Sequence, residues 1–159
     1  MPEARRSAHA EPMTDTTTTQ SDTDLRSRRE RTIREHMAAE NRHDIAATLE
    51  TFSQANYDVV ALGAPTNGAA AVDDLLHTLF GAFPDFAAEA LSLHHGDDIV
   101  FVDVRMTGTH DGTWAGVPPS GHPIDVRCGC IFHFDGPDLV KETVFFDHAT
   151  LLAQIGVGG

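Results

Sequence analysis

The stretch HPIDVRCGCIFHFDGPDLVKETVFF (residues 122–146) alternates apolar and polar residues, which is the period of a β-strand. In its first arm, one face holds Val126, Cys128, Cys130, Phe132 and Phe134, and the intervening residues face the other way. The turn residues DGP separate this arm from DLVKETVFF. The run therefore predicts two long antiparallel strands with one apolar face.

A second hairpin is predicted just upstream, in FAAEALSLHHGDDIVFVDVRMTGTH (residues 86–110), with GDD as its turn. The residues before it favour helices: SRRERTIREHMAAEN (27–41), with Ser27 and Glu30 as a capping box, a short helix capped by Asp44, and the amphipathic run at 67–85.

The run NYDVVALG (56–63) predicts a short strand between these helices, and HATLLAQIG (148–156) predicts a closing helix. Helices followed by antiparallel hairpins define an α+β domain. We expect one curved antiparallel sheet wrapped around the N-terminal helices and enclosing an apolar pocket.

Length and charge restrict the class of protein. A chain of 159 residues fits one domain, which we place at 25–157, after a disordered polar tail at 1–24. The net charge of -13 argues against binding to nucleic acid or to anionic membranes. No membrane-spanning run and no secretory signal is recognisable, and Cys128 and Cys130 are interpreted as buried thiols of a cytoplasmic protein.

Four motifs in this order carry a family resemblance: AFPD (82–85), GTHDGTWAGVPPSGHPIDVR (108–127), FHFDG (132–136) and DHATLLAQIG (147–156). Over roughly residues 26–156 the chain resembles the SnoaL-like polyketide cyclases of the nuclear transport factor 2-like superfamily, whose α+β folds are cone-shaped. The resemblance implies a pocket without a cofactor, a polyketide-like hydrophobic ligand, and a homodimer or homotetramer. It also implies ring closure of a polyketide ester by intramolecular aldol condensation.

Asp147 has two interpretations. Locally it is a good N-cap for the last helix. The resemblance instead places it at the position of the family's acid/base aspartate, where Phe145 would help to exclude water and raise its pKa. A protonated Asp147 would then donate to the oxygen of the attacked ketone.

Other residues are candidates for the pocket. His110 would polarise a substrate carbonyl or anchor the loop that follows it. Arg127 and His133 share a strand face and would orient an oxyanion, although Arg127 could instead pair with Asp103 or Asp125. Trp114 would cover the substrate or pack over the sheet edge.

Asn56 and Tyr57 begin the first strand and are candidate hydrogen-bonding groups of the pocket, whereas His36 could equally face water. No metal site is expected, because adjacent His94 and His95 point to opposite faces of a strand and no zinc-binding motif is present.

Three functions compete at this point. The first is an acid/base catalyst, cyclase-like or ketosteroid isomerase-like, and the second is a non-catalytic ligand-binding module of the same fold. The third is an epoxide hydrolase variant that would use Asp147, Arg127 and Asp125 around a water. The direction of the Asp147 side chain distinguishes the first two.

Overall fold

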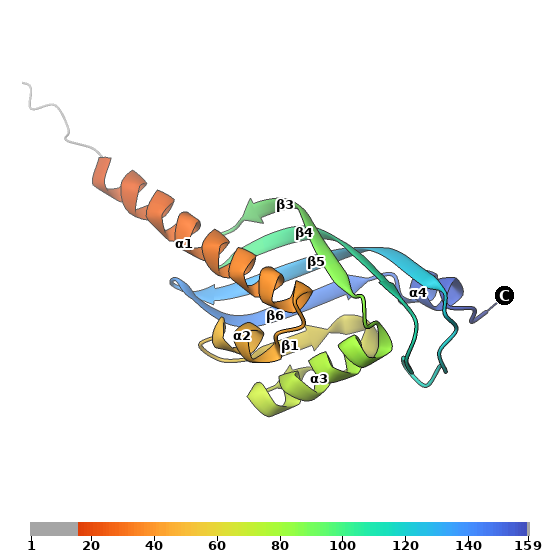
Figure 1. Cartoon of the computed structure of the whole chain (residues 1–159). Coiled ribbons are helices and arrows are strands. Elements are labelled where there is room, and N and C mark those ends of the chain that lie inside the picture. Colours follow the sequence, from red (N-terminus) through yellow and green to blue (C-terminus); the bar gives the residue numbers. More distant parts are fainter. Residues whose placement is uncertain (1–15, 159) are drawn as a thin grey trace, which may run out of the picture.

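The computed structural model of the protein describes residues 16–158 (Figure 1). The predicted helices and strands occur in the predicted order, but the run at 56–63 is a strand only at 56–59, a 3-10 helix follows it, and a further short strand lies at 66–67. The helices are α1 (Thr16–Asn41), α2 (Ile45–Glu50), the 3-10 helix η1 (Val60–Leu62), α3 (Ala69–Ala82) and α4 (His148–Gln154). The strands are β1 (Asn56–Val59), β2 (Thr66–Asn67), β3 (Ala87–His95), β4 (Ile99–Thr109), β5 (Pro123–Asp135) and β6 (Asp138–Phe146).

The strands form one sheet in the order β2-β1-β6-β5-β4-β3. The two predicted hairpins, β3–β4 and β5–β6, are confirmed as antiparallel pairs. The sheet is mixed rather than fully antiparallel, because β1 runs parallel to β6. Breaks in register between Ala90 and Ser92 and between His133 and Phe134 bend the sheet. Figure 1 shows α1, α2 and α3 on one side of it, which confirms the α+β class.

The core lies between the inner face of the sheet and the helices. The predicted face of β5 is confirmed, since Val126, Cys128, Cys130, Phe132 and Phe134 are all buried. Helices contribute apolar stripes that pack on this face; their buried members include Ile33 and Met37 of α1 and Val72 and Leu76 of α3.

Helix α1 begins earlier than expected. Residues 16–24, assigned from sequence to a disordered tail, are its first turns, and Figure 1 shows them projecting beyond the sheet. Ser27 is not a cap, because its hydroxyl donates to the Thr23 carbonyl within the helix at 3.0 Å. Polar pairs one turn apart, such as Gln20 with Asp24 at 3.1 Å, support this solvent-exposed part. Residues 1–15 of the expected tail lie outside the described residues.

The side chain of Arg29 connects α1 to the sheet through hydrogen bonds. Its guanidinium is buried and donates to two backbone carbonyls, Asp97 at 2.6 Å and Gly136 at 2.8 Å, one in each hairpin turn. It also lies 5.2 Å from the ring centre of Phe134. One side chain therefore sets where the helix crosses both hairpins.

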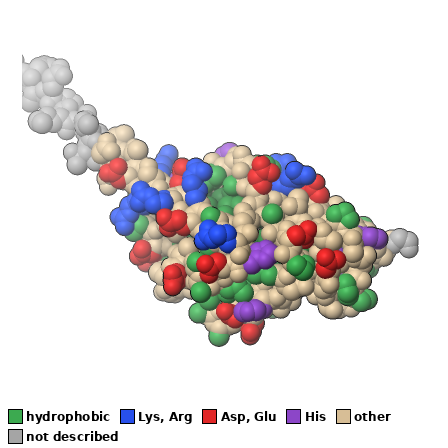
Figure 2. All heavy atoms as spheres, viewed as in Figure 1, with side chains coloured by type: hydrophobic (Ala, Val, Ile, Leu, Met, Phe, Trp, Pro, Cys, Tyr) green, Lys and Arg blue, Asp and Glu red, His purple; other side chains and the backbone are tan. Residues whose placement is uncertain are grey.

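The surface is predominantly acidic. In the view of Figure 2, Asp and Glu side chains are spread over the molecule, whereas basic side chains gather mainly over α1, which carries the exposed Arg26, Arg28, Arg31 and Arg34. Within residues 16–158, no helix is long and apolar enough to cross a membrane.

Candidate functional site

A cavity opens between the inner face of the sheet and the helices, where the sequence predicted one. The cavity has a volume of about 80 Å³, several times the roughly 10–15 Å³ that one water requires. Most of its wall is apolar, and its aromatic lining residues are Tyr57, Phe83, Phe86, Trp114, Phe132 and Phe146. The cavity can therefore enclose a small hydrophobic molecule.

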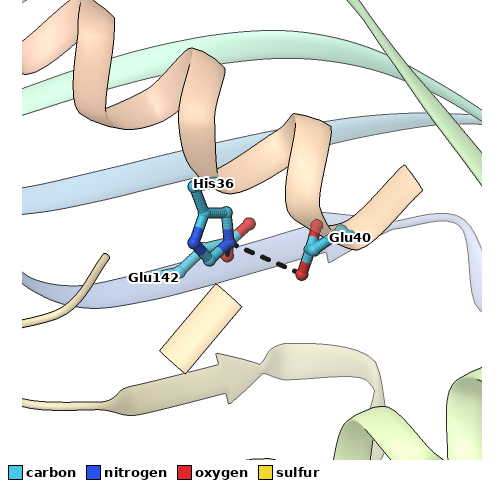
Figure 3. Close-up of side chains that lie close together, drawn as sticks. All are labelled: His36, Glu40 and Glu142. Carbon is cyan, nitrogen blue, oxygen red and sulfur yellow. Dashed lines mark hydrogen bonds and ion pairs between the residues drawn. The ribbon is translucent and has the colours of Figure 1, made fainter. Parts of the chain in front are cut away.

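Two carboxylates and a phenol interrupt this apolar wall. Glu40 comes from α1, Tyr57 from β1 and Glu142 from β6, and all three are buried lining residues. In the parallel β1–β6 pair, Tyr57 stands opposite Glu142. His36 lies one helical turn before Glu40, is fully buried, and points with it towards Glu142 (Figure 3).

His36 is the centre of this cluster. Its Nε2 lies 2.8 Å from the Tyr57 hydroxyl, 3.2 Å from Glu142 Oε2 and 3.5 Å from Glu40 Oε1. The Tyr57 hydroxyl in turn donates to Glu40 Oε1 at 2.5 Å. Four polar side chains from three elements thus form one connected network.

The hydrogen bonds assign the protons of His36. The Thr51 hydroxyl donates its proton to the Thr48 carbonyl at 2.6 Å, so at 2.8 Å from His36 it accepts from Nδ1–H. On the other side of the ring, the Tyr57 proton is already given to Glu40. Nε2 therefore also acts as a donor, to the Tyr57 oxygen and to Glu142, and the ring carries two protons.

The electrostatics agree with this assignment. Burial alone would lower the pKa of His36, but the charge of Glu40 and hydrogen bonds to Glu142 and Glu40 outweigh it and raise the pKa to about 10. Burial tends to raise the pKa of Glu40, yet His36 and Tyr57 bring it below its usual value. Burial and the two carboxylates raise the pKa of Tyr57, which stays protonated.

Aromatic rings hold the imidazole in place. Phe52 meets it edge-on with ring centres 5.2 Å apart, and Phe132 does so at 5.6 Å. His36 is therefore fixed by packing as well as by hydrogen bonds.

The same cluster is the only group in the described part of the chain with the spacing of metal ligands. One ligand atom from each of His36, Glu40 and Glu142 lies within 4.8 Å of the others. Hydrogen bonds with Tyr57 and between His36 and Glu142 also link these groups into the network described above.

Comparison with known protein families identifies the family of this chain. Residues 30–155 match the model of the SnoaL-like polyketide cyclases. The chain belongs to the SnoaL-like polyketide cyclase family. Its fold is accordingly the nuclear transport factor 2-like fold, which ketosteroid isomerases share.

Solved structures agree on this fold. A proposed SnoaL-like polyketide cyclase from Jannaschia sp. CCS1 is 20% identical, with 84% of this chain and 94% of that one covered and a TM-score of 0.73. AclR from Streptomyces galilaeus, a proposed hydroxylase, is 24% identical with 82% and 96% covered and a TM-score of 0.70.

A proposed polyketide cyclase from Xanthomonas campestris pv. campestris is 18% identical, with 83% of this chain and 99% of that one covered and a TM-score of 0.71. No curated protein sequence matches the chain. At these identities the solved structures support the fold and leave the reaction of this SnoaL-like protein open.

In this SnoaL-like protein, Asp147 is the N-cap of α4. Its carboxylate accepts from the Thr150 backbone at 3.0 Å and from the Thr150 hydroxyl at 2.7 Å, which caps α4. It is exposed and does not line the cavity, and these bonds lower its pKa. Phe145 is 46% exposed on the opposite face of β6, so the aromatic residue that lines the cavity here is Phe146.

His110 anchors the β4–β5 loop. Its Nδ1 lies 3.0 Å from the Ser120 hydroxyl, and its backbone bonds to His122, Ser120 and Gly121. The ring is buried against Phe83 but does not line the cavity. The structure therefore gives His110 the anchoring role.

The same loop brings Trp114 into the cavity wall, where it is 5% exposed. The loop rests on the end of α3: a Cβ on Gly112 would lie only 2.0 Å from the Gly81 carbonyl oxygen, so this contact requires glycine. The indole Nε1–H of Trp114 is buried and has no hydrogen-bond partner among residues 16–158.

Arg127 and His133 lie on the outer face of β5, away from the cavity. Arg127 makes two hydrogen bonds to Asp103, and Arg105 does the same with Asp125. His133 contacts the Thr143 hydroxyl at 3.1 Å. Because strand alternation turns all of them outward, the structure does not assemble the epoxide hydrolase arrangement.

Of the two residues that begin β1, Tyr57 reaches the cavity, whereas Asn56 donates to the Val140 carbonyl at 3.0 Å and joins two strands. Sequence reasoning missed Glu40 and Glu142 and left His36 as a surface candidate. A signal was present, since His36 and Glu40 continue the apolar stripe of Ile33 and Met37 on α1.

Proposed function

We propose that this SnoaL-like protein is an acid/base catalyst without a cofactor, which moves a proton at a carbon next to a carbonyl in a hydrophobic, polyketide-like substrate. The observation that supports this most is the buried His36–Glu40–Tyr57–Glu142 network at the wall of an apolar cavity. Carboxylates and a phenol in water-poor surroundings are groups suited to such chemistry.

Glu142 is the proposed base. It lines the cavity, accepts a hydrogen bond from His36 Nε2 at 3.2 Å, and contributes to the raised pKa of Tyr57 beside it. Glu40 is held by Tyr57 and His36, which lower its pKa and make it a weaker base. Glu40 therefore serves to keep His36 charged, and Glu142 is left to accept the proton.

Tyr57 is the proposed donor to the oxygen that gains charge. Its single O–H proton bonds to Glu40 in the free protein, so the hydroxyl would rotate to donate to the substrate oxygen instead. Its raised pKa keeps the hydroxyl protonated, and His36 donates to the same oxygen, which strengthens it as a donor. The apolar wall, with Trp114 among its residues, would pack against the rest of the substrate. The Tyr57 hydroxyl would stabilise an enolate without a metal.

Ring closure follows from the same groups. Glu142 takes the proton as the C–H bond breaks, and the resulting enolate carbon attacks a second carbonyl of the same molecule to form the C–C bond. The alkoxide then takes the proton back from Glu142 while Tyr57 hydrogen-bonds to it. The catalyst is regenerated, and the cavity contributes by holding the two carbons together.

The experiment separates proton abstraction from ring closure. The protein is incubated in D₂O with α-tetralone, an aromatic ketone of compact size, and exchange at the α-carbon is followed by NMR. We expect Glu142→Gln to slow exchange at least about 100-fold and Tyr57→Phe to slow it by a smaller factor.

Asp147→Asn is the matched control, because it removes a carboxylate that lies outside the cavity. Exchange that is unaffected by Glu142→Gln would refute the proposed base. A ketone that binds but never exchanges would instead identify the protein as a ligand-binding module of this fold.

A further inference from the structure

Acidic side chains outnumber basic ones at the polar side of the cavity. Glu40 and Glu142 are 8% and 3% exposed, and the one basic side chain that contacts them is His36. The residues that line the cavity include no lysine or arginine. Nearby cations are engaged elsewhere: Lys141 pairs with Asp58, and Arg29 binds backbone carbonyls. Among residues 16–158, a single imidazolium thus faces two carboxylates.

A buried carboxylate without a cationic partner is costly, and more so beside an apolar wall. The wall of this cavity is also suited to a cation, because six of its lining residues carry aromatic rings. Ring faces attract ammonium groups, and this attraction strengthens when water is excluded. Carboxylates and aromatic rings together favour a positively charged organic group.

We infer that the cavity binds a small hydrophobic ligand carrying one positively charged amine, seated between the Glu40–Glu142 pair and the aromatic wall. Free carboxylates and phosphates are disfavoured, because the two glutamates would repel them. The inference names the substrate class of the proposed function and uses the same carboxylates, but it does not require them to move protons.

The test compares two probes of the same shape that differ by one charge. Phenyltrimethylammonium carries the charge, and tert-butylbenzene is its neutral isostere. Binding to the full chain at pH 7.5 is followed by the fluorescence of Trp114, the one tryptophan of the sequence, which lines the cavity. We expect the cation to bind at least about tenfold more tightly, equivalent to roughly 1.4 kcal/mol.

Glu142→Gln and Glu40→Gln keep the shape of the side chain and remove its charge, so each should reduce the preference for the cation. Glu35→Gln is the matched control on α1, because Glu35 is exposed and does not line the cavity. Circular dichroism and thermal melting establish that each variant is folded.

Equal affinity for the two probes would overturn the inference, since one carboxyl would then carry a proton and the site would be neutral. A preference that persists in both glutamate variants would overturn it as well. If the protein catalyses deuterium exchange but shows no preference for the cation, only this inference is refuted. If it binds the cation but catalyses no exchange, only the proposed catalysis is refuted.

Discussion

Replacing His36 by glutamine should remove a large part of the pH dependence of folding stability. The pKa of His36 is raised from 6.5 to about 10 in the folded protein, so the folded state keeps a proton that the unfolded chain has lost. The stabilising contribution is complete below about pH 6.5, decreases as the pH rises and is lost above about pH 10. Across this interval it corresponds to roughly 5 kcal/mol.

The assay is urea unfolding at several pH values between 6.5 and 10, followed by the fluorescence of Trp114. The difference in free energy of unfolding between wild type and His36→Gln should be largest at pH 6.5 and should shrink towards pH 10. Ile33→Ala is the control, because Ile33 is buried on the same helix and does not titrate. It should lower stability by roughly 2–5 kcal/mol at every pH.

A constant difference between wild type and His36→Gln across this pH range would refute the reasoning. It would mean that the proton assigned to Nε2 is absent at pH 6.5 or that it contributes equally to the unfolded chain.

Further variants test individual contacts. Asp147→Ala should lower stability by about 1 kcal/mol in urea unfolding and leave α-tetralone exchange intact, because it removes a helix cap. Thr51→Val should slow exchange and shift its pH profile, whereas Thr51→Ser should restore both, because only a hydroxyl accepts from His36 Nδ1–H. Arg29→Lys should lower the melting temperature, as an ammonium cannot reproduce the two guanidinium bonds. Unchanged values in these measurements would contradict the assigned contacts.

The long strands were predictable because side chains alternate across a sheet, and β5 shows this period clearly, since its even-numbered residues from 124 to 134 are buried. The start of α1 was not, because residues 16–24 have no apolar stripe and are held by polar contacts within the helix. Hydrophobic periodicity predicts only helices that are packed against something.

The site was predicted in part, with Tyr57 and Trp114 reaching the cavity and Asp147 remaining at its helix cap. The missed cluster joins residues of α1 to Glu142, about a hundred positions later in the chain. The parallel pairing of β1 with β6 then places Tyr57 opposite Glu142 and completes the cluster. Parallel strands are not joined by a hairpin turn, so the sequence contains no local pattern that predicts this register.

The polar residues of the cavity wall come from only some of the elements that form it, and this division affects which substrates variants of the protein can accept. The carboxylates and the phenol of the wall come from α1, β1 and β6, whereas α3 and the β4–β5 loop contribute apolar side chains such as Leu75, Leu79 and Trp114. Substitutions in α3 or the loop can change the outline of an accepted molecule while the proton-carrying groups keep their geometry. Selection, or a designed library, can thus explore new substrates at low risk to the chemistry.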